Sequence, residues 1–264
     1  MNKSFTYKGS NFCLNDKKVF LNSGEIHYFR IRREHWDVHL EAALEAGLTT
    51  VSTYIPWAWH EPEEGRFDLD GTTCPERDLE GWLKKCHAHG LHCIVKPGPF
   101  ILAETRGAGL PDWFSDRYGD AVKMRNSKGE VVASDGVSLF HPVYQEKVTL
   151  WYDRIMPFIR DRELSAGGPV IMMQVCNEIG VFPWLAHQAD YGEGIRERFI
   201  EYLEKKYAGI SEINQLWGTA YKDFDEVELP PDGRSPFAAI GDRSRDQEWH
   251  LFWRTYYGDY LRML

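Results

Sequence analysis

The stretch Val170–Glu178 decides the fold class and reads VIMMQVCNE. It begins with a mainly apolar run of strand length, which follows the chain breakers Gly168 and Pro169. A short apolar run bounded by turn residues is typical of a strand buried in a parallel sheet. We therefore expect a buried strand over 170–175 that presents the polar pair Asn177 and Glu178 at its carboxyl end.

Similar runs precede this strand along the chain. We expect strands over Gly24–Phe29, Leu48–Ile55 and Leu91–Lys96. Apolar residues at helical spacing alternate with these runs and predict helices over Arg33–Ala46, Asp78–His89 and Pro142–Ile159. Strands that alternate with helices indicate a parallel α/β fold.

The two ends of the chain have other patterns. Phe5–Phe20 predicts a short β-hairpin with Asn15 and Asp16 in its turn. Towards the carboxyl end we expect helices over Gly194–Tyr207, near Ile213–Trp217 and over Arg245–Leu264, with a Pro- and Gly-rich loop at Leu229–Gly241. The sequence has no internal repeat and no low-complexity stretch.

Residues suited to a functional site lie at or just beyond the carboxyl end of each expected strand: His27, Tyr54–Trp57, Pro97–Glu104 and Asn177-Glu178. In a (β/α)8 barrel the functional side chains lie at the carboxyl ends of the strands. A doubly wound sheet fits the alternation equally well, but its usual glycine-rich phosphate turn is missing after the first strand. We therefore predict the α/β class: a TIM barrel truncated to about its first four βα units, with an N-terminal hairpin.

The composition argues against several classes of protein. A net charge of −9 without a basic cluster makes nucleic acid an unexpected partner. No apolar run reaches the ~18 residues of a membrane span, and residues 1–10 lack the apolar core of a secretory signal. The 5 cysteines fit no zinc spacing, so we expect no metal and a cytoplasmic protein with reduced thiols. Aromatic residues, 14% of the chain, suit either a large core or a cleft that stacks on sugars.

Glu178 is the best candidate for acid–base chemistry. Hydrolysis of a glycosidic bond needs two carboxyl groups, one to protonate the leaving oxygen and one to attack the anomeric carbon or activate water. Glu178 emerges at the tip of a buried strand, and the amide of Asn177 beside it can donate to a sugar hydroxyl. From the local sequence alone, a helix-capping Asn with a Glu in the first turn is an alternative.

Several motifs resemble those of glycoside hydrolase family 35, the β-galactosidases. In chain order they are SGEIHYFR at 23–30, TYIPW at 53–57, HEPEEG at 60–65, KPGPFILAE at 96–104, GLPDW at 109–113 and QVCNE at 174–178. A later segment, Tyr191–Asp223, is similar to the family 42 β-galactosidases. Both families belong to one clan of retaining barrel enzymes, so the resemblance implies a TIM-barrel glycosidase that acts on a β-galactoside or oligosaccharide and needs no cofactor.

The resemblance also implies roles for individual residues. Glu178 would be the acid/base of a retaining exo-β-glycosidase, and Asn177 its hydroxyl-binding neighbour. Tyr54 would hydrogen-bond the sugar or orient a catalytic carboxylate. Ala103 and Glu104 would line the pocket for the terminal sugar.

Trp57 would stack on the sugar, and three of these residues have a structural alternative. Trp57 could instead pack under its loop, and Tyr54 could be a buried tyrosine with a satisfied hydroxyl. Glu104 could form an ion pair with Arg106 or Arg125.

The chain departs from the family 35 pattern at four positions. Leu102 replaces the usual Cys, Thr105 the usual Trp, Cys176 the common acidic residue and Ile179 the common aromatic one. These exchanges remove polar and aromatic contacts, which puts strict galactose specificity in doubt. The alternatives are a β-glucosidase or β-mannosidase-like member of the clan, or a non-catalytic fragment for carbohydrate binding or assembly.

No second carboxylate follows a buried strand. The nucleophile of this clan is a Glu at the end of strand seven, so we expect it beyond residue 264 and assign none in this chain. We treat residues 1–264 as a single portion of a catalytic domain, with the hairpin over 1–22 and the first half of the barrel over 23–264. A half-barrel has two open edges, so we expect it to be inactive alone, and poorly stable, rearranged, or paired with a second copy or the missing barrel half.

Overall fold

The computed structural model describes residues 3–132, 136–180, 189–230 and 243–264. Their contacts group into two compact units: unit 1 comprises residues 1–117 and 148–178, and unit 2 residues 118–147 and 179–264. Helix α5 (Pro142–Arg160) belongs partly to each. That a single catalytic domain includes both units stays a prediction. The expected loop at Leu229–Gly241 lies, beyond Pro230, outside the described residues.

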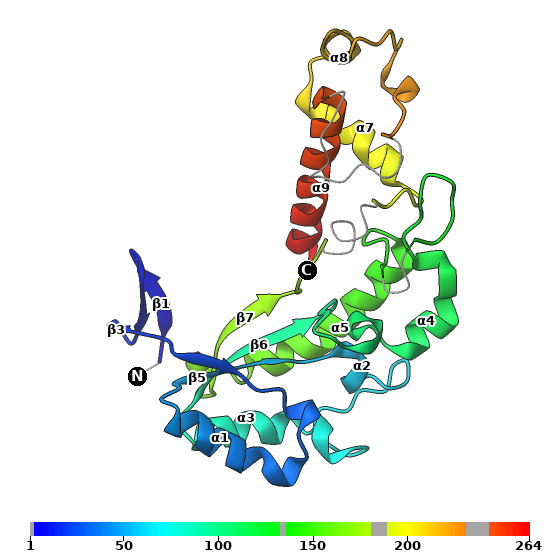
Figure 1. Cartoon of the computed structure of the whole chain (residues 1–264). Helices are drawn as coiled ribbons and strands as arrows, with labels where there is room; N and C mark the ends of the chain where they lie inside the picture. The colour runs from blue at the N-terminus through cyan, green and yellow to red at the C-terminus, as the bar shows by residue number, and fades with distance from the viewer. Residues whose placement is uncertain (1–2, 133–135, 181–188, 231–242) are drawn as a thin grey trace. The chain divides into compact units, whose positions relative to one another are not determined.

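Unit 1 is built on a four-stranded parallel sheet (Figure 1). Its strands lie side by side in chain order: β4 (Ser23–Glu25), β5 (Thr50–Tyr54), β6 (His92–Gly98) and β7 (Val170–Val175). A doubly wound sheet reverses its strand order at a switch point, whereas the strands of a barrel follow one another without reversal. The predicted parallel α/β fold is confirmed, and the strand order is that of a barrel.

Strand β4 is shorter than the expected strand over Gly24–Phe29. It ends at Glu25, and a 3-10 helix follows at Tyr28–Arg30. Tyr28 is fully buried there, with its ring stacked 5.8 Å from that of Trp82. The chain therefore turns away from the sheet directly after β4, where the ring of Tyr28 is buried against Trp82.

Two helices cover one side of this sheet. Figure 1 shows α1 (Trp36–Glu45) and α3 (Leu79–Ala88) next to each other below the strands. Trp36 and Trp82 are completely buried, and their rings meet edge to face at 5.5 Å. Burial of such side chains stabilises the layer by roughly 2–3 kcal/mol each.

The remaining elements of the first 180 residues are short. Two helices, α2 (Trp57–His60) and α4 (Asp112–Tyr118), were not expected from the sequence pattern. Further 3-10 helices lie at Arg33–His35, Pro75–Arg77, Arg106–Gly109, Gly119–Val122 and Leu164–Ala166.

The N-terminal segment forms a three-stranded antiparallel sheet rather than a single hairpin. Its strands are β1 (Phe5–Lys8), β2 (Asn11–Leu14) and β3 (Lys17–Val19), paired in that order. Asn15 and Asp16 form the turn between β2 and β3, with φ of 50° and 66°. Both tolerate this left-handed geometry, which a tight hairpin turn of this kind requires.

Unit 2 contains α7 (Ile195–Lys206), α8 (Ile210–Trp217), a 3-10 helix at Phe224–Glu226 and α9 (Arg243–Met263). Aromatic rings join α7 to α9: Phe199 lies 5.0 Å from Trp249 and 5.3 Å from Phe252. The buried carboxylate of Glu248 accepts hydrogen bonds from Tyr202, Tyr207 and Lys206. The aromatic composition is therefore used here for packing.

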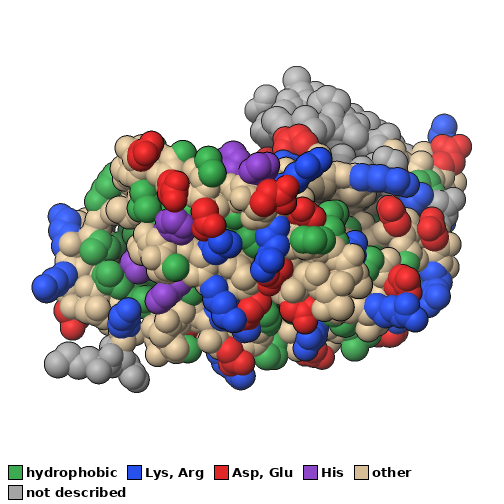
Figure 2. Space-filling view, turned by 90° about the horizontal axis from the view of Figure 1, so that it is seen from below, with side chains coloured by type: hydrophobic (Ala, Val, Ile, Leu, Met, Phe, Trp, Pro, Cys, Tyr) green, Lys and Arg blue, Asp and Glu red, His purple; other side chains and the backbone are tan. Residues whose placement is uncertain are grey.

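Acidic and basic side chains are interspersed on the face that Figure 2 shows. No helix within residues 3–132, 136–180, 189–230 and 243–264 is long and apolar enough to span a bilayer.

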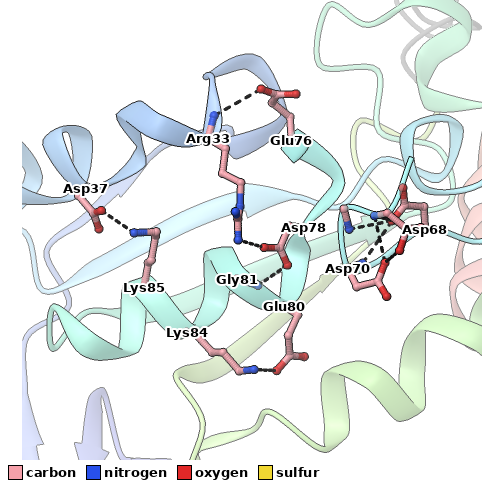
Figure 3. Close-up of polar contacts among 12 residues, drawn as sticks. Arg33, Asp37, Asp68, Asp70, Glu76, Asp78, Glu80, Gly81, Lys84 and Lys85 are labelled. Atoms are coloured by element: carbon pink, nitrogen blue, oxygen red, sulfur yellow. Dashed lines mark hydrogen bonds and ion pairs between the residues drawn. The ribbon is translucent and has the colours of Figure 1, made fainter. Parts of the chain in front are cut away.

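Polar contacts fix the start of α3 against the segment before α1 (Figure 3). Asp78 is the N-cap of α3, and its Oδ1 accepts from the backbone N–H of Gly81 at 2.7 Å. Its other oxygen forms an ion pair with Arg33, 45 residues earlier in the chain. One carboxylate thus caps a helix and joins two elements.

We expect Asp78→Ala to lower the free energy of unfolding by about 1–2 kcal/mol, because α3 loses its cap and Arg33 its partner. Asp78→Asn keeps an acceptor for Gly81 and should cost clearly less. Urea denaturation followed by tryptophan fluorescence measures both. Equal losses in the two variants would contradict the capping role.

His60 joins the segment after β4 to the loop that follows α2. The ring is fully buried, with Nδ1 2.6 Å from the carbonyl oxygen of Asp68 and Nε2 paired with the hydroxyl of Tyr28. A carbonyl only accepts, so Nδ1 carries the hydrogen and Nε2 accepts from Tyr28. Burial lowers the pKa of His60 from 6.5 to about 4, which keeps the ring neutral at pH 7.

The folded state therefore resists protonation of His60 while the unfolded state accepts it. Stability contributed by the neutral ring is complete above pH 6.5 and falls as the pH drops towards 4. His60→Gln should reduce the slope of stability against pH in this window by about one proton. Urea midpoints at several pH values test this, with the exposed His39→Gln as control. If the slope of stability against pH is unchanged in His60→Gln, another group causes the loss of stability in acid.

Candidate active site

Residues from three strand ends of unit 1 meet around Tyr54. The Tyr54 side chain is 6% exposed and packs against Ile101 and Ala103. The ring of His27 lies 5.2 Å from that of Tyr54, and Nζ of Lys96 lies 4.4 Å from the Tyr54 ring centroid. The structure thus brings together residues at or just beyond the carboxyl ends of β4, β5 and β6.

Three carboxylates act on the phenol of Tyr54. Burial, reinforced by the negative charges of Glu25, Glu178 and Glu104, raises the pKa of Tyr54 to about 12, and the nearby Arg30 opposes the shift. Glu178, which follows β7, is therefore part of the same electrostatic environment as Tyr54. The phenol is neutral at pH 7, so it can donate a hydrogen bond and does not act as a phenolate nucleophile.

Glu25 is committed to a structural ion pair. It pairs with Lys96, whose side chain is 12% exposed. His27 lies beside this pair, with Nε2 3.9 Å from the Glu25 carboxylate, and burial lowers the pKa of His27. Glu25 is paired with Lys96, which leaves Glu104 and Glu178 as the carboxylates of this cluster that can contact a substrate.

The backbone after β7 is tied to the backbone after β6. The N–H of Asn177 donates to the carbonyl of Phe100 at 3.0 Å, and its side-chain Nδ2 donates to the carbonyl of Ile101 at 2.8 Å. The thiol of Cys176 also donates to Phe100 O, at 3.2 Å. These bonds fix the point at which the exposed Glu178 leaves the sheet.

The segment that carries Glu104 has an unusual backbone. Leu102, Ala103 and Glu104 are consecutive left-handed residues, with φ of 52°, 48° and 49°. Such non-glycine conformations cost roughly 1 kcal/mol or more each and cluster at functional sites. Two donors offset the cost: Nη2 of Arg30 bonds Ala103 O at 2.6 Å, and the hydroxyl of Thr105 bonds Leu102 O at 2.7 Å.

Glu104 is exposed at the end of this turn. Arg106, one of its two expected ion-pair partners, lies 3.6 Å from Asp112 instead. The other, Arg125, belongs to unit 2, where it donates to the carbonyl of Gly129, so its pairing with Glu104 stays a prediction. The Glu104 carboxylate is close enough to Tyr54 to affect its pKa. This position is compatible with the predicted contact to sugar hydroxyls.

Trp57 does not take the predicted place on the sugar. Its side chain is completely buried, stacks at 6.3 Å on Trp151 and donates from Nε1 to Glu61. A ring with no exposed surface cannot stack on a ligand that arrives from solvent. Trp57 therefore packs under the loop after β5, as in the structural alternative considered from the sequence.

The residues that orient this site lie in the family motifs or at a departure from them, but the sequence assigned them no role. Arg30, Thr105 and Gln174 act through backbone carbonyls or another side chain, and the Arg30 contact spans 73 residues. Within the described ranges, no group of His, Cys, Asp and Glu is arranged to hold a metal ion. The nucleophile stays a prediction.

Parallel strands in barrel order, with carboxylates, an amide and a neutral phenol at their carboxyl ends, are the arrangement expected of part of a TIM-barrel glycosidase. Solved structures support the fold. A β-galactosidase from Marinomonas ef1 matches with a TM-score of 0.60 at 19% identity, over 92% of this chain and 35% of that one. The catalytic domain of a β-amylase from Paenibacillus polymyxa matches with a TM-score of 0.57 at 14% identity, over 91% and 60%.

The chain belongs to glycosyl hydrolases family 35, whose sequence pattern matches residues 11–222. A β-1,2-glucosyltransferase of Ignavibacterium album is 40% identical over 96% of this chain and 35% of its own length. An exo-β-D-glucosaminidase of Pyrococcus horikoshii is 32% identical over 98% and 33%. A β-galactosidase of Felis catus is 34% identical over 74% and 26%. The chain therefore spans about a third of the length of the curated relatives that it matches from end to end.

We expect Arg30→Ala to loosen the left-handed turn without unfolding unit 1, because Ala103 O loses its guanidinium donor. Amide hydrogen exchange at Leu102 and Thr105 should accelerate by about tenfold, the equivalent of one hydrogen bond. In the wild type the N–H of Leu102 donates to the carbonyl of Ala108, and the N–H of Thr105 donates to the carbonyl of Leu102. Amides of β5 should keep their exchange rates.

Arg32→Ala is the matched control, since it removes a neighbouring exposed arginine. It should leave the exchange rates of the Leu102 and Thr105 amides unchanged. Wild-type exchange rates in Arg30→Ala would show that Arg30 does not hold this segment.

Proposed function

We propose that the whole protein is a retaining, exo-acting enzyme for terminal β-linked sugars, with Glu178 as its acid/base. The observation that carries this proposal is the pair of hydrogen bonds that joins Asn177 to Phe100 and Ile101, because it places Glu178 beside the segment that leads to Glu104. The charges of both carboxylates act on the neutral phenol of Tyr54. Glu178 would protonate the leaving oxygen and then deprotonate the incoming acceptor. The nucleophilic carboxylate would be supplied beyond residue 264.

The terminal sugar that we propose has the gluco configuration, and galactose is the second candidate. The relatives that align over 96–98% of this chain carry names that specify glucosyl or glucosamine groups. Those named β-galactosidase align over 74–75% of it. This ranking departs from the expectation of a β-galactosidase as the first choice.

Two of the departures from the family 35 pattern support this ranking. The hydroxyl of Thr105 and the thiol of Cys176 donate to backbone carbonyls, of Leu102 and Phe100 respectively. Neither offers that hydrogen to a sugar. Because one hydrogen bond to a hydroxyl can shift specificity by orders of magnitude, the loss of a polar contact at 176 and an aromatic one at 105 weakens the case for strict galactose recognition.

The acceptor in the second half of the reaction is water or a sugar hydroxyl, since one carboxylate activates either. Identification of the products with and without added sugar acceptor separates hydrolysis from transfer. A non-catalytic carbohydrate-binding protein is the alternative from another class, and it would bind the sugar without turnover by the whole protein.

The decisive experiment compares Glu178→Ala with wild type in the whole protein on aryl β-glucoside, β-galactoside and β-glucosaminide. We expect highest kcat/KM for the glucoside, and a loss of about 10²–10⁴-fold in Glu178→Ala for poor leaving groups. Azide should restore turnover and yield a glycosyl azide of retained configuration.

Glu45→Gln, an exposed change at the end of α1, serves as the control and should keep full activity. Inversion at the anomeric carbon, or full activity in Glu178→Ala, would refute the proposed role. A galactoside preference would refute the choice of sugar alone.

A further inference from the structure

Two side-chain amides lie in series at the end of β7. Nε2 of Gln174 donates to the side-chain Oδ1 of Asn177 at 2.8 Å and to the carbonyl of Cys176 at 3.1 Å. Nδ2 of Asn177 in turn donates to the carbonyl of Ile101 at 2.8 Å. The chain of bonds therefore runs from Gln174 through Asn177 to the segment after β6.

The direction of this chain is fixed at both ends by backbone carbonyls. Ile101 O can only accept, so the atom of Asn177 that faces it must be the NH2 group. Cys176 O can only accept, so the NH2 group of Gln174 must face it. Both amides are thus held in one of their two orientations.

The bonding capacity that remains differs between the two amides. Both hydrogens of Gln174 Nε2 are used, which leaves Gln174 no donor for a ligand. Asn177, which is partly exposed, retains one N–H and one lone pair on Oδ1. One donor beside one acceptor is the complement of a hydroxyl group, which itself donates and accepts.

The family resemblance already implies that Asn177 binds the sugar hydroxyl beside the reacting carbon. We propose, on the basis of the proposed function, that Gln174 is a positioning residue that holds Asn177 in the one orientation that can bind this hydroxyl, which lies on C2 of the terminal sugar. Asn177 adjoins the acid/base Glu178, and C2 adjoins the anomeric carbon on which that acid/base acts. A hydroxyl satisfies both free sites of Asn177. An ammonium group on C2 has no lone pair, so it would leave the N–H of Asn177 unmatched.

The test uses a pair of aryl β-glucosides, one with the 2-hydroxyl and one 2-deoxy, with the whole protein. Wild type should favour the 2-hydroxy substrate. In Gln174→Met, which keeps the length of the side chain without its donors, that preference should fall by about tenfold, the equivalent of one hydrogen bond. The kcat/KM for the 2-deoxy substrate should stay unchanged, since this substrate makes no such bond.

Gln174→Glu adds a signature in the pH profile. An ionised carboxylate at position 174 can only accept hydrogen bonds, as can the Oδ1 of Asn177 that it faces. The bond that orients Asn177 is therefore absent, and the preference should be lost at neutral pH. It should recover as the pH falls and the carboxyl becomes a donor again. The ratio of two substrates cancels the pH dependence that both share.

Gln215→Met, the same change on the exposed face of α8, is the control and should keep the wild-type ratio. Equal losses on both substrates in Gln174→Met would assign Gln174 a merely structural role and overturn the inference. An unchanged ratio would overturn it as well. In both cases the proposed function stands, whereas a wild type that turns over neither substrate would refute that function and this inference together.

Discussion

The hydrogen bonds between the carboxyl ends of β6 and β7 are the constraint on which the candidate site depends. The register shifts between Val95 and Gly98, so that Gly98 pairs with Val175. The backbone N–H of Cys176 then donates to the carbonyl of Gly98 at the end of β6, and the N–H of Asn177 donates to the carbonyl of Phe100 just after it. Bulges of this kind re-aim the chain at the ends of strands. Without these hydrogen bonds, Glu178 would leave the sheet at a place unrelated to Tyr54 and Glu104. Helix α5 supports the end of β6, because Trp151 and Tyr152 donate hydrogen bonds to the carbonyls of Pro97 and Gly98.

The same hydrogen bonds between the ends of β6 and β7 explain why strained backbone conformations cluster here. Left-handed non-glycine residues occur on both sides of them: Leu102, Ala103 and Glu104 after β6, and Cys176 and Glu178 after β7. Isolated, such conformations would relax, because each costs about 1 kcal/mol or more. They persist because backbone and side-chain donors from outside the turns hold the carbonyls between them. The strain and the predicted substrate contacts therefore coincide, while the left-handed pair at Asn15 and Asp16 is an ordinary hairpin turn.

The sequence was sufficient for those features that rest on local pattern. Apolar runs located the four parallel strands, and Tyr54 at the end of β5 and Glu178 after β7 are close enough for the charge of Glu178 to raise the pKa of Tyr54. It was insufficient where the decisive contact is remote in the chain or lies in the orientation of a side chain. Trp57 is buried by a helix about 90 residues later, and nothing in the pattern around Arg30 indicates its bond to Ala103. The direction of the amide chain through Gln174 follows from carbonyls whose positions exist only in the folded state.

Relatives that share this segment carry names for different sugars and for both transfer and hydrolysis. The acid/base, which all such reactions need, cannot be the source of that difference. Specificity is instead expected to come from polar groups near the acid/base that the fold leaves free for a ligand. The hydrogens of Thr105 and Cys176 are bonded to the backbone, whereas Asn177 keeps one donor and one acceptor, beside the Tyr54 phenol and the Glu104 carboxylate. Such a site is sensitive to each of these groups, since one mismatched hydrogen bond to a substrate can shift specificity by orders of magnitude. Changes of substrate in this family are therefore expected at residues that orient these groups as much as at the groups themselves.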